Sequence, residues 1–487
     1  MRIHTSLRLL LALPLVALAA CSGGGDSGVA LARTPAATTM TLKDNGFSFA
    51  NFSAKRTTEE FNAEDLVAMF GNGKEVCTGG SEPCNPTPEA AAFARMVNQA
   101  RASGHCEGLV ALAASRFVEK VNPVTGTLQK DADVVHAILR AFATQFLPES
   151  KAETDGWAKK SINDILAAIS TNLGKDVPEY TLNLYSPNGG HALLPLAIEF
   201  PDNDHAVLHV YDSNWPDKDR YVSFDLKKNE WSFSFSGKDQ ANDPNIWTGK
   251  KGDIDIASLT TRKASTCPFC SEEGKVRNTM LVIRAKDRNF ALETDEGTIT
   301  PDSPGTGEAT LKPLAGPGAE PGDDQPVDYV ATVPATSKTL KVTAKTEAKV
   351  TALTTGGISE ATTPTGGSAA PIEISSSGIA VDDPNVTLTL AAGDYVVTSA
   401  GSKNSLAASD AGVTATLDGA TGKPVTVQTS TDTPAIEVAG AGAPGVPTDA
   451  EYVVKSQSTD GKVEQTVVNS DGSKKTTGID GTLGNTS

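Results

Sequence analysis

Aromatic, sulfur-containing and imidazole side chains are scarce in this chain of 487 residues, and their absence is concentrated at one end. Phe, Trp and Tyr make up only 5% of the sequence, and beyond Phe290 there is no Phe, Trp, His, Cys or Met. Thiol and imidazole groups are common nucleophiles and bases in covalent catalysis. We therefore expect no catalytic site in the part of the chain that follows Phe290.

Positive charge is also scarce, because 42 Lys and Arg residues stand against 59 Asp and Glu residues, a net charge of −17. No basic cluster stands anywhere after the N-terminal segment. Binding to nucleic-acid phosphates needs a basic surface. The composition therefore argues against nucleic acid as a partner.

Long apolar runs are rare, and the most prominent one covers residues 9–20 behind two arginines. This run is too short to span a bilayer. It ends in Leu18-Ala19-Ala20-Cys21, which is typical of a bacterial signal peptide with a lipid-attachment cysteine, and an ordinary secretory signal is the alternative. The sequence predicts a signal peptide at residues 1–20, lipid on Cys21 and a tether at residues 21–58. The chain would then be lipid-anchored to a bacterial membrane in the cell envelope, facing the periplasm or the exterior.

Cysteine is rare, and its placement is informative. The six cysteines are Cys21, Cys77, Cys84, Cys106, Cys267 and Cys270. In an oxidising compartment Cys77 is near enough to pair with Cys84, and Cys267 with Cys270. A zinc half-site or a redox pair is the alternative for Cys267 and Cys270, but a zinc site wants four ligands. Cys106 is left over, either as a reactive thiol or as a buried structural one.

The predicted elements change in kind along the chain. Apolar residues recur at helical spacing in residues 61–70, 87–103, 131–146 and 157–173, and a further helix starts at Cys106. Short strand-like runs follow from residue 181 to residue 235. Helices followed by an antiparallel sheet predict the α+β fold class.

This pattern divides the chain after the tether. We assign the α+β domain to residues 59–292. Prolines, glycines and acids without periodicity predict a linker at residues 293–327. Alternating residues predict a β-rich or partly disordered C-terminal region at residues 328–456, and residues 457–487 are expected to form a disordered tail.

One constellation in the α+β domain suggests covalent catalysis. Cys106 lies between Gly104 and Gly108 at the start of a helix, where unpaired N–H groups favour a thiolate. A base must lie within hydrogen-bond reach of such a thiol, and a third group must orient that base. His191, which follows two glycines, is the candidate base, and the segment from Asp212 to Asn214 supplies candidate orienting groups.

Strand register supports this grouping. If Phe200 pairs with His205 across the turn between them, His191 lies opposite Asn214 and diagonal to Asp212, on one face of the hairpin. His205 and His209 then point to the other face. We favour Asp212 as the orienting group, because a carboxylate also stabilises an imidazolium ion, and Asn214 is the second choice.

The order of these residues resembles the papain-like cysteine peptidase superfamily. The phrases Gly-His-Cys-Glu-Gly-Leu, Gly-Gly-His-Ala-Leu-Leu-Pro and Val-Tyr-Asp-Ser-Asn-Trp-Pro look like a secreted bacterial branch of it. The resemblance covers residues 60–290. It implies a helical subdomain with an antiparallel sheet, in which Cys106 is the nucleophile, His191 the general base and Asp212 its orienting group.

The resemblance also implies an upstream glutamine that stabilises the oxyanion together with the N–H of the cysteine. Gln99 is the nearest glutamine, one residue further upstream than in papain, and Asn98 is the other candidate. His105 and Trp215 are candidates for shaping the pocket.

These observations favour a cysteine hydrolase, peptidase-like by resemblance, that acts on a peptide or protein through a thioester on Cys106. No cofactor and no metal is expected. Two alternatives remain open: a catalytically silent surface lipoprotein that binds a partner, and an acyl transferase of the transglutaminase type.

Overall fold

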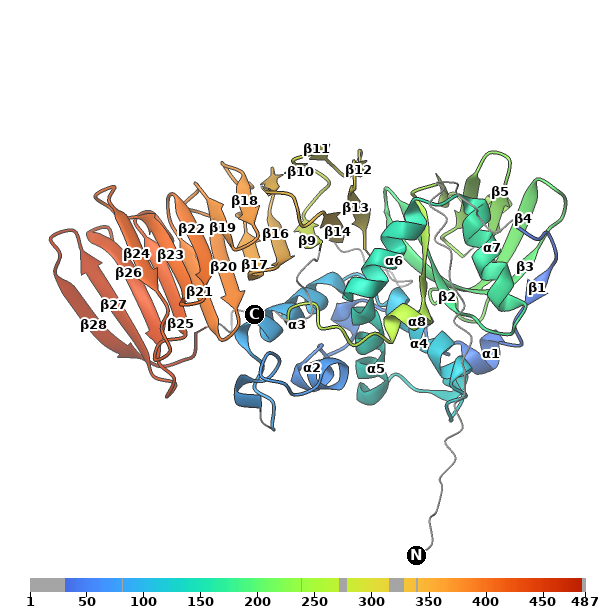
Figure 1. Ribbon diagram of the computed structural model, residues 1–487, viewed down its shortest axis with the longest axis horizontal. Helices are drawn as coiled ribbons and strands as arrows, with labels where there is room; N and C mark the ends of the chain where they lie inside the picture. The colour runs from blue at the N-terminus through green and yellow to red at the C-terminus, as the bar shows by residue number, and fades with distance from the viewer. Residues whose placement is uncertain are drawn as a thin grey trace, which may run out of the picture.

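The computed structural model describes residues 31–80, 82–237, 239–270, 278–314, 328–338 and 340–483, and within them the fold is α+β (Figure 1). This confirms the predicted fold class. The predicted signal peptide at residues 1–20 and the lipid site at Cys21 lie outside the described residues. None of the described helices combines the length and the apolar character that a bilayer crossing requires.

Along the chain, helices α1 to α7 precede strands β2 to β8 of the first large sheet, and α8 follows these strands. They are α1 (Leu42–Asn45), α2 (Ala63–Phe70), α3 (Pro88–Ala100), α4 (Cys106–Val118), α5 (Ala132–Ala143), α6 (Pro148–Ala158), α7 (Ile162–Leu173) and α8 (Leu259–Arg262). Local sequence signals fix several of their starts. The Thr87 side chain accepts a hydrogen bond from the Ala90 N–H beside Pro88 at the first position of α3, and Asp131 caps α5 in the same way through Val134.

The first sheet is antiparallel and has the order β7-β6-β5-β4-β3-β2-β8, with the short β1 added beside β3. Its strands are β1 (Ala36–Ala37), β2 (Tyr180–Ser186), β3 (Gly189–Glu199), β4 (His205–Tyr211), β5 (Arg220–Asp225), β6 (Glu230–Ser234), β7 (Ile246–Lys250) and β8 (Ile254–Ser258). The long β3 pairs with β2 through its first half and with β4 through its second half. The sheet thereby places the start of β3 near the end of β4.

The C-terminal region consists of two further sheets that share one core of buried Val, Ile, Leu and Ala residues. In Figure 1 they form a row of strands that extends away from the helices. The larger has the order β12 (Gly305–Thr306), β13 (Ala309–Pro313), β14 (Asp328–Val333), β9 (Thr279–Ala285), β16 (Ala348–Thr354), β17 (Gly357–Thr362), β20 (Thr387–Ala392), β21 (Tyr395–Ala400), β25 (Ala435–Gly440), β26 (Ala450–Gln457), β27 (Val463–Asn469) and β28 (Lys474–Ile479). The smaller has the order β11 (Gly297–Ile299), β10 (Phe290–Thr294), β15 (Leu340–Ala344), β18 (Ile372–Ser375), β19 (Gly378–Val381), β22 (Asn404–Ser409), β23 (Gly412–Asp418) and β24 (Pro424–Gln428).

Three of the predicted boundaries differ from the structure. The predicted tether at residues 21–58 is wrong from Ala36 onward, because β1 pairs with β3 and the rings of Phe47 and Phe52 are buried. The predicted domain end at residue 292 comes too late, because β9 already belongs to the larger C-terminal sheet. The predicted linker at residues 293–327 contains β11, β12 and β13, although residues 315–327 lie outside the described part.

The predicted disordered tail at residues 457–487 is the other difference. Residues 463–479 form β27 and β28, which extend the larger sheet by a hairpin that starts from β26. The outer strand β28 is almost entirely exposed, so it lacks the apolar pattern by which a buried strand is recognised. Pairing with β27 rather than burial of side chains holds it in place.

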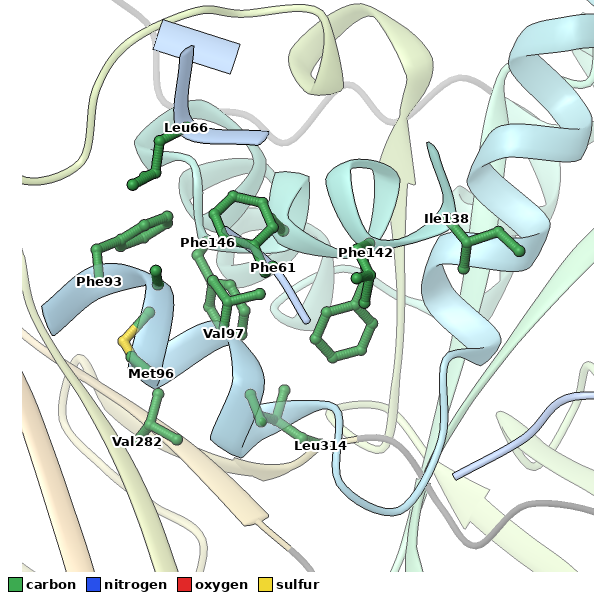
Figure 2. Close-up of a cluster of buried hydrophobic side chains, with 14 of the residues drawn as sticks. Phe61, Leu66, Phe93, Met96, Val97, Ile138, Phe142, Phe146, Val282 and Leu314 are labelled. Atoms are coloured by element: carbon green, nitrogen blue, oxygen red, sulfur yellow. The ribbon is translucent and has the colours of Figure 1, made fainter. Parts of the chain in front are cut away.

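The helices and the C-terminal region pack directly on one another. One hydrophobic cluster contains Met96 and Val97 of α3 together with Val282 of β9 and Leu314, as Figure 2 shows. An ion pair of 3.1 Å between Arg95 and Glu360 of β17 lies along the same contact. The C-terminal region is therefore part of one packed body with the helices.

Candidate active site

The candidate nucleophile lies at the position that the sequence predicts. Cys106 is the first residue of α4, and its side chain is the free thiol among the described cysteines. Gly108 has a packing role here, because a Cβ atom at this position would lie 2.3 Å from the carbonyl oxygen of Ile138 in α5. A side chain at residue 108 would thus push apart the two helices that hold the thiol in place.

The candidate base and its orienting group are in direct contact. Nε2 of His191, on β3, lies 2.8 Å from Oδ1 of Asp212, just after β4. The residues are buried, with 1% of Cys106, 2% of His191 and 1% of Asp212 exposed. The Asp212 carboxylate also accepts a hydrogen bond of 2.9 Å from the backbone N–H of Asn214, which fixes its orientation.

The register that brings these groups together arises differently from the prediction. The predicted pair of Phe200 with His205 is wrong, because Glu199 pairs with Val207 at that end of the hairpin. A bulge between Pro195 and Ala197 then shifts the pairing by one residue, and Leu194 pairs with Tyr211. This last pair has the register that the sequence argument assumed near His191. His191 and Asp212 therefore come together as predicted, but through a bulge that the sequence pattern does not predict.

The two other histidines of this hairpin point away from the site, as expected. His205 contacts Asp202, and His209 contacts Asp219 at 3.2 Å, and all four side chains are partly or largely exposed. Both imidazole rings are accessible to solvent. They contribute nothing to the buried constellation.

The environment of His191 favours its charged form. Burial is the largest single influence and opposes the charge, but the Asp212 carboxylate, its hydrogen bond and the neighbouring Cys106 together raise the pKa of His191 to about 10. The other ring nitrogen, Nδ1, has no oxygen or nitrogen partner in the described part of the chain. An imidazolium ion between a carboxylate and a thiol is the arrangement that activates a cysteine nucleophile.

The sequence argument missed three side chains around this pair. Nε of Arg220 lies 3.7 Å from Oδ2 of Asp212, on the side away from His191 Nε2. Phe233 stacks on the imidazole at 6.1 Å between ring centres, and Phe235 contacts it edge-on at 5.2 Å. Sequence offered one signal for the aromatic pair: both rings come from the alternating strand-like run that ends at residue 235.

Asn214 and His105 support the loop before α4. The Asn214 amide oxygen accepts a hydrogen bond of 2.9 Å from Asn51, whose own amide oxygen accepts one of 2.7 Å from the backbone N–H of His105. Nδ1 of His105 donates to the carbonyl of Phe52 at 2.6 Å. Burial and then Arg101 lower the pKa of His105 to about 3, so this ring is neutral. His191 is oriented by Asp212, and neither Asn214 nor His105 lines the cavity at the thiol.

The remaining candidates, Asn98, Gln99 and Trp215, are also absent from the wall of the cavity at Cys106. Asn98 is occupied by Phe61, with which it exchanges hydrogen bonds of 2.9 and 3.0 Å, so its amide is not available to an oxyanion. The backbone carbonyl of Gln99 is bound by Arg284, and its side chain does not line the cavity. Trp215 donates to the carbonyl of Phe235 at 3.2 Å and does not line the cavity.

A cavity of about 60 Å³ lies against Cys106 and His191. Its wall is contributed by helices, by the first sheet and by the C-terminal region. The lining residues are Cys106, Glu107, Gln145, Phe146, Ser150, Lys151, Thr154, Asn183, Tyr185, Gly190, His191, Ala192, Ala257, Arg262, Lys312, Pro313, Leu314 and Val330. The volume is enough for about four water molecules, so the space beside the thiol is small.

The contribution of the C-terminal region to this wall was not expected. The backbone N–H of Gly190 donates to the carbonyl of Leu314 at 2.9 Å, next to the catalytic candidate His191. A Cβ atom at Gly190 would lie 2.6 Å from the carbonyl oxygen of Pro313, so only glycine allows this approach. The sequence predicted residues 293–327 to be a linker, and no local signal marks residues 312–314 as part of a site.

Both predicted cysteine pairs are confirmed. Cys77 is bonded to Cys84 and Cys267 to Cys270, with Cα atoms 5.1 and 5.3 Å apart. Phe269, between the last two, packs on Phe93 at 5.2 Å, which gives this pair a structural role in the helical core. Two disulfides indicate folding in an oxidising, extracytoplasmic compartment.

Comparisons of the chain with protein-family models, with curated proteins and with solved structures find no match. In the described residues there is also no group of three or more His, Cys, Asp or Glu side chains placed to hold a metal ion. The chemistry of the site therefore has to be argued from its own geometry.

Proposed function

We propose that this chain is a lipid-anchored, extracytoplasmic cysteine hydrolase with a papain-like catalytic domain, which acts on a peptide or protein through a thioester on Cys106. The proposal rests chiefly on one observation: a buried free thiol at a helix start shares its environment with a His191 ring held 2.8 Å from Asp212. A chain that used Cys106 only for packing would have no need of a buried histidine–aspartate pair beside it.

In the proposed reaction each of the three residues has one role. Cys106 attacks a carbonyl carbon, and the N–H groups in the first turn of α4 stabilise the developing oxyanion. His191 gives its proton to the leaving group, and the acyl group remains on sulfur. Water then attacks the thioester and returns a proton to His191, while Asp212 holds the ring and its charge in place. An amine in place of water would give acyl transfer.

Two features support the proposed location. The disulfides indicate an oxidising compartment. The segment Leu18-Ala19-Ala20-Cys21 provides a candidate site of lipid attachment, by which the chain would be held on a bacterial membrane.

A second function, a silent module that binds a partner, is favoured by the burial of the thiol. Only 1% of Cys106 is exposed, so a large substrate cannot reach it without movement of the wall. The two functions differ in the reactivity of the thiol. A binding module has no reason to hold an activated thiolate.

Alkylation of Cys106 by iodoacetamide tests the proposal. We expect the full chain to be modified at Cys106 faster than glutathione near pH 7, and the variant His191→Ala to lose this excess. Peptide mass analysis assigns the modified cysteine, and His209→Ala serves as a control on the same hairpin. Equal rates for Cys106 in the wild type and in His191→Ala would show that no activated thiol exists, and the binding module would then be the better description.

A further inference from the structure

Besides His191, three residues that line the cavity at Cys106 carry a buried polar atom without a hydrogen-bond partner among the described residues. The atoms are the hydroxyl of Ser150 on α6, the amide oxygen of Asn183 on β2 and Nε of Arg262 on α8. The three side chains belong to residues that are 1%, 8% and 7% exposed. Buried polar atoms in native proteins are nearly always bonded to protein or to ordered water, so these three atoms offer hydrogen bonds to a polar group that enters the cavity.

The orientation of the Asn183 amide is fixed by its neighbour. Its Nδ2 donates to Oδ1 of Asp255 at 3.0 Å, so the free atom is the oxygen, an acceptor. Nε–H of Arg262 is a donor, because the other guanidinium nitrogens are engaged by Glu107, Thr181 and Thr144. The wall therefore offers one acceptor, one donor and one hydroxyl that can serve as either.

The charges on the wall are already balanced. Lys151 pairs with Asp155 at 2.5 Å, Lys312 pairs with Asp255, and Arg262 pairs with Glu107. A carboxylate would bring an uncompensated negative charge beside these acids, and an apolar group would leave the three polar atoms unsatisfied. An uncharged group with both a donor and an acceptor fits. The cavity of about 60 Å³ restricts that group to a few heavy atoms.

We propose that this cavity binds a terminal carboxamide, such as the end of a glutamine side chain, and presents it to Cys106 as the acyl donor. This inference rests on the proposed function and names its substrate class. Sulfur attacks the carboxamide carbon, the C–N bond breaks, and His191 transfers its proton to the departing nitrogen, which leaves as ammonia. Water then attacks the thioester and gives a proton to His191, which frees a carboxylic acid and restores the thiolate. An internal peptide bond carries chain on both sides, which a cavity of about 60 Å³ does not accommodate.

Three alkylating reagents test this preference on the full chain. Iodoacetamide carries a terminal carboxamide, iodoacetate a carboxylate, and N-benzyliodoacetamide a substituted amide. Each rate at Cys106 is divided by the rate of the same reagent with glutathione. We expect the corrected rate for iodoacetamide to exceed the other two by about tenfold or more.

Variants assign the preference to the cavity wall. Ser150→Ala and Asn183→Leu are expected to reduce the ratio between iodoacetamide and iodoacetate, whereas Ser170→Ala on α7 leaves it unchanged. Ser150→Ala removes one oxygen atom only, so it provides the test if Asn183→Leu does not fold. Equal corrected rates for the three reagents, or a faster rate with either of the other two, overturn the inference. Such a result leaves the proposed function standing, because that function fails only if His191→Ala has no effect on any reagent.

Discussion

Replacement of Asp212 by Asn separates the charge of this residue from its hydrogen bond. An asparagine oxygen in the position of Oδ1 can still accept from Nε2 of His191, 2.8 Å away. What is lost is the attraction between two unit charges, about 6 kcal/mol at that distance with an effective dielectric constant of about 20. Burial of the ring then acts almost unopposed, and we expect the pKa of His191 to fall from about 10 to its ordinary value of 6.5 or below.

This change has a consequence for stability that can be worked out in sign. The pKa of His191 is higher in the folded chain than in the unfolded one, so the bound proton stabilises the fold fully below pH 6.5. That contribution is lost as the pH rises toward 10. Between these limits the free energy of unfolding should fall by about 1.4 kcal/mol per pH unit through this group. In Asp212→Asn the slope should be close to zero.

Urea unfolding at a series of pH values between 7 and 10 measures the slope, and the pH profile of Cys106 alkylation measures the loss of the ion pair. The matched control is Asp219→Asn, which removes an exposed carboxylate 3.2 Å from the partly exposed His209. We expect no measurable effect there, because exposed pairs contribute little. If Asp212→Asn follows the wild type in both measurements, the assignment of Asp212 as the group that charges His191 is refuted.

Two further substitutions test other contacts of the site. His105→Gln should reduce the loss of stability on acidification. The pKa of this buried ring is about 3, so its contribution to stability is present above pH 6.5 and is lost as the pH falls toward 3. Urea unfolding at pH 4 and pH 7 measures this loss, and an unchanged difference between the two pH values would contradict the prediction. Gly190→Ala should destabilise the chain by about 1–3 kcal/mol, because its Cβ atom would lie 2.6 Å from the Pro313 carbonyl oxygen. Thermal unfolding compares it with Gly478→Ala, where nothing lies within 4 Å, and equal melting temperatures would show that the close approach at Gly190 carries no strain.

The parts of the structure that local rules govern could be predicted from the sequence. The start of α3 after Thr87 and the start of α5 after Asp131 follow from capping, which depends on neighbouring residues only. The disulfides follow from short separations along the chain. The start of α4 at Cys106 was predicted from the glycines and the apolar run around it, although no side chain caps this helix.

The oxyanion candidates failed for a geometric reason. Asn98 and Gln99 are adjacent in α3, and adjacent helical residues point about 100° apart. Asn98 faces Phe61, while Gln99 is buried near the contact with the C-terminal region, where Arg284 binds its carbonyl. A shift of one residue relative to the papain spacing is therefore enough to turn an amide away from the thiol.

The C-terminal strands could not be placed because their partners lie far along the chain. Buried strands such as β14 are covered on both faces, so they show no alternation of apolar and polar residues. The register of β9 between β14 and β16 depends on pairing over long separations, which a local pattern does not record. The linker at residues 293–327 was predicted for this reason, and with it the contribution of Leu314 was missed.

The contact between Leu314 and Gly190 bears on the role of the C-terminal region. Burial opposes the charge on His191, so the Asp212 carboxylate has to stay fixed at short range to hold the proton. Pro313 and Leu314 line the cavity beside this ring, and the carbonyl of Leu314 accepts from Gly190, the neighbour of His191. The C-terminal region also contributes Lys312 and Val330 to the wall of the cavity in which Cys106 and His191 lie. We therefore regard the C-terminal region as one wall of the site.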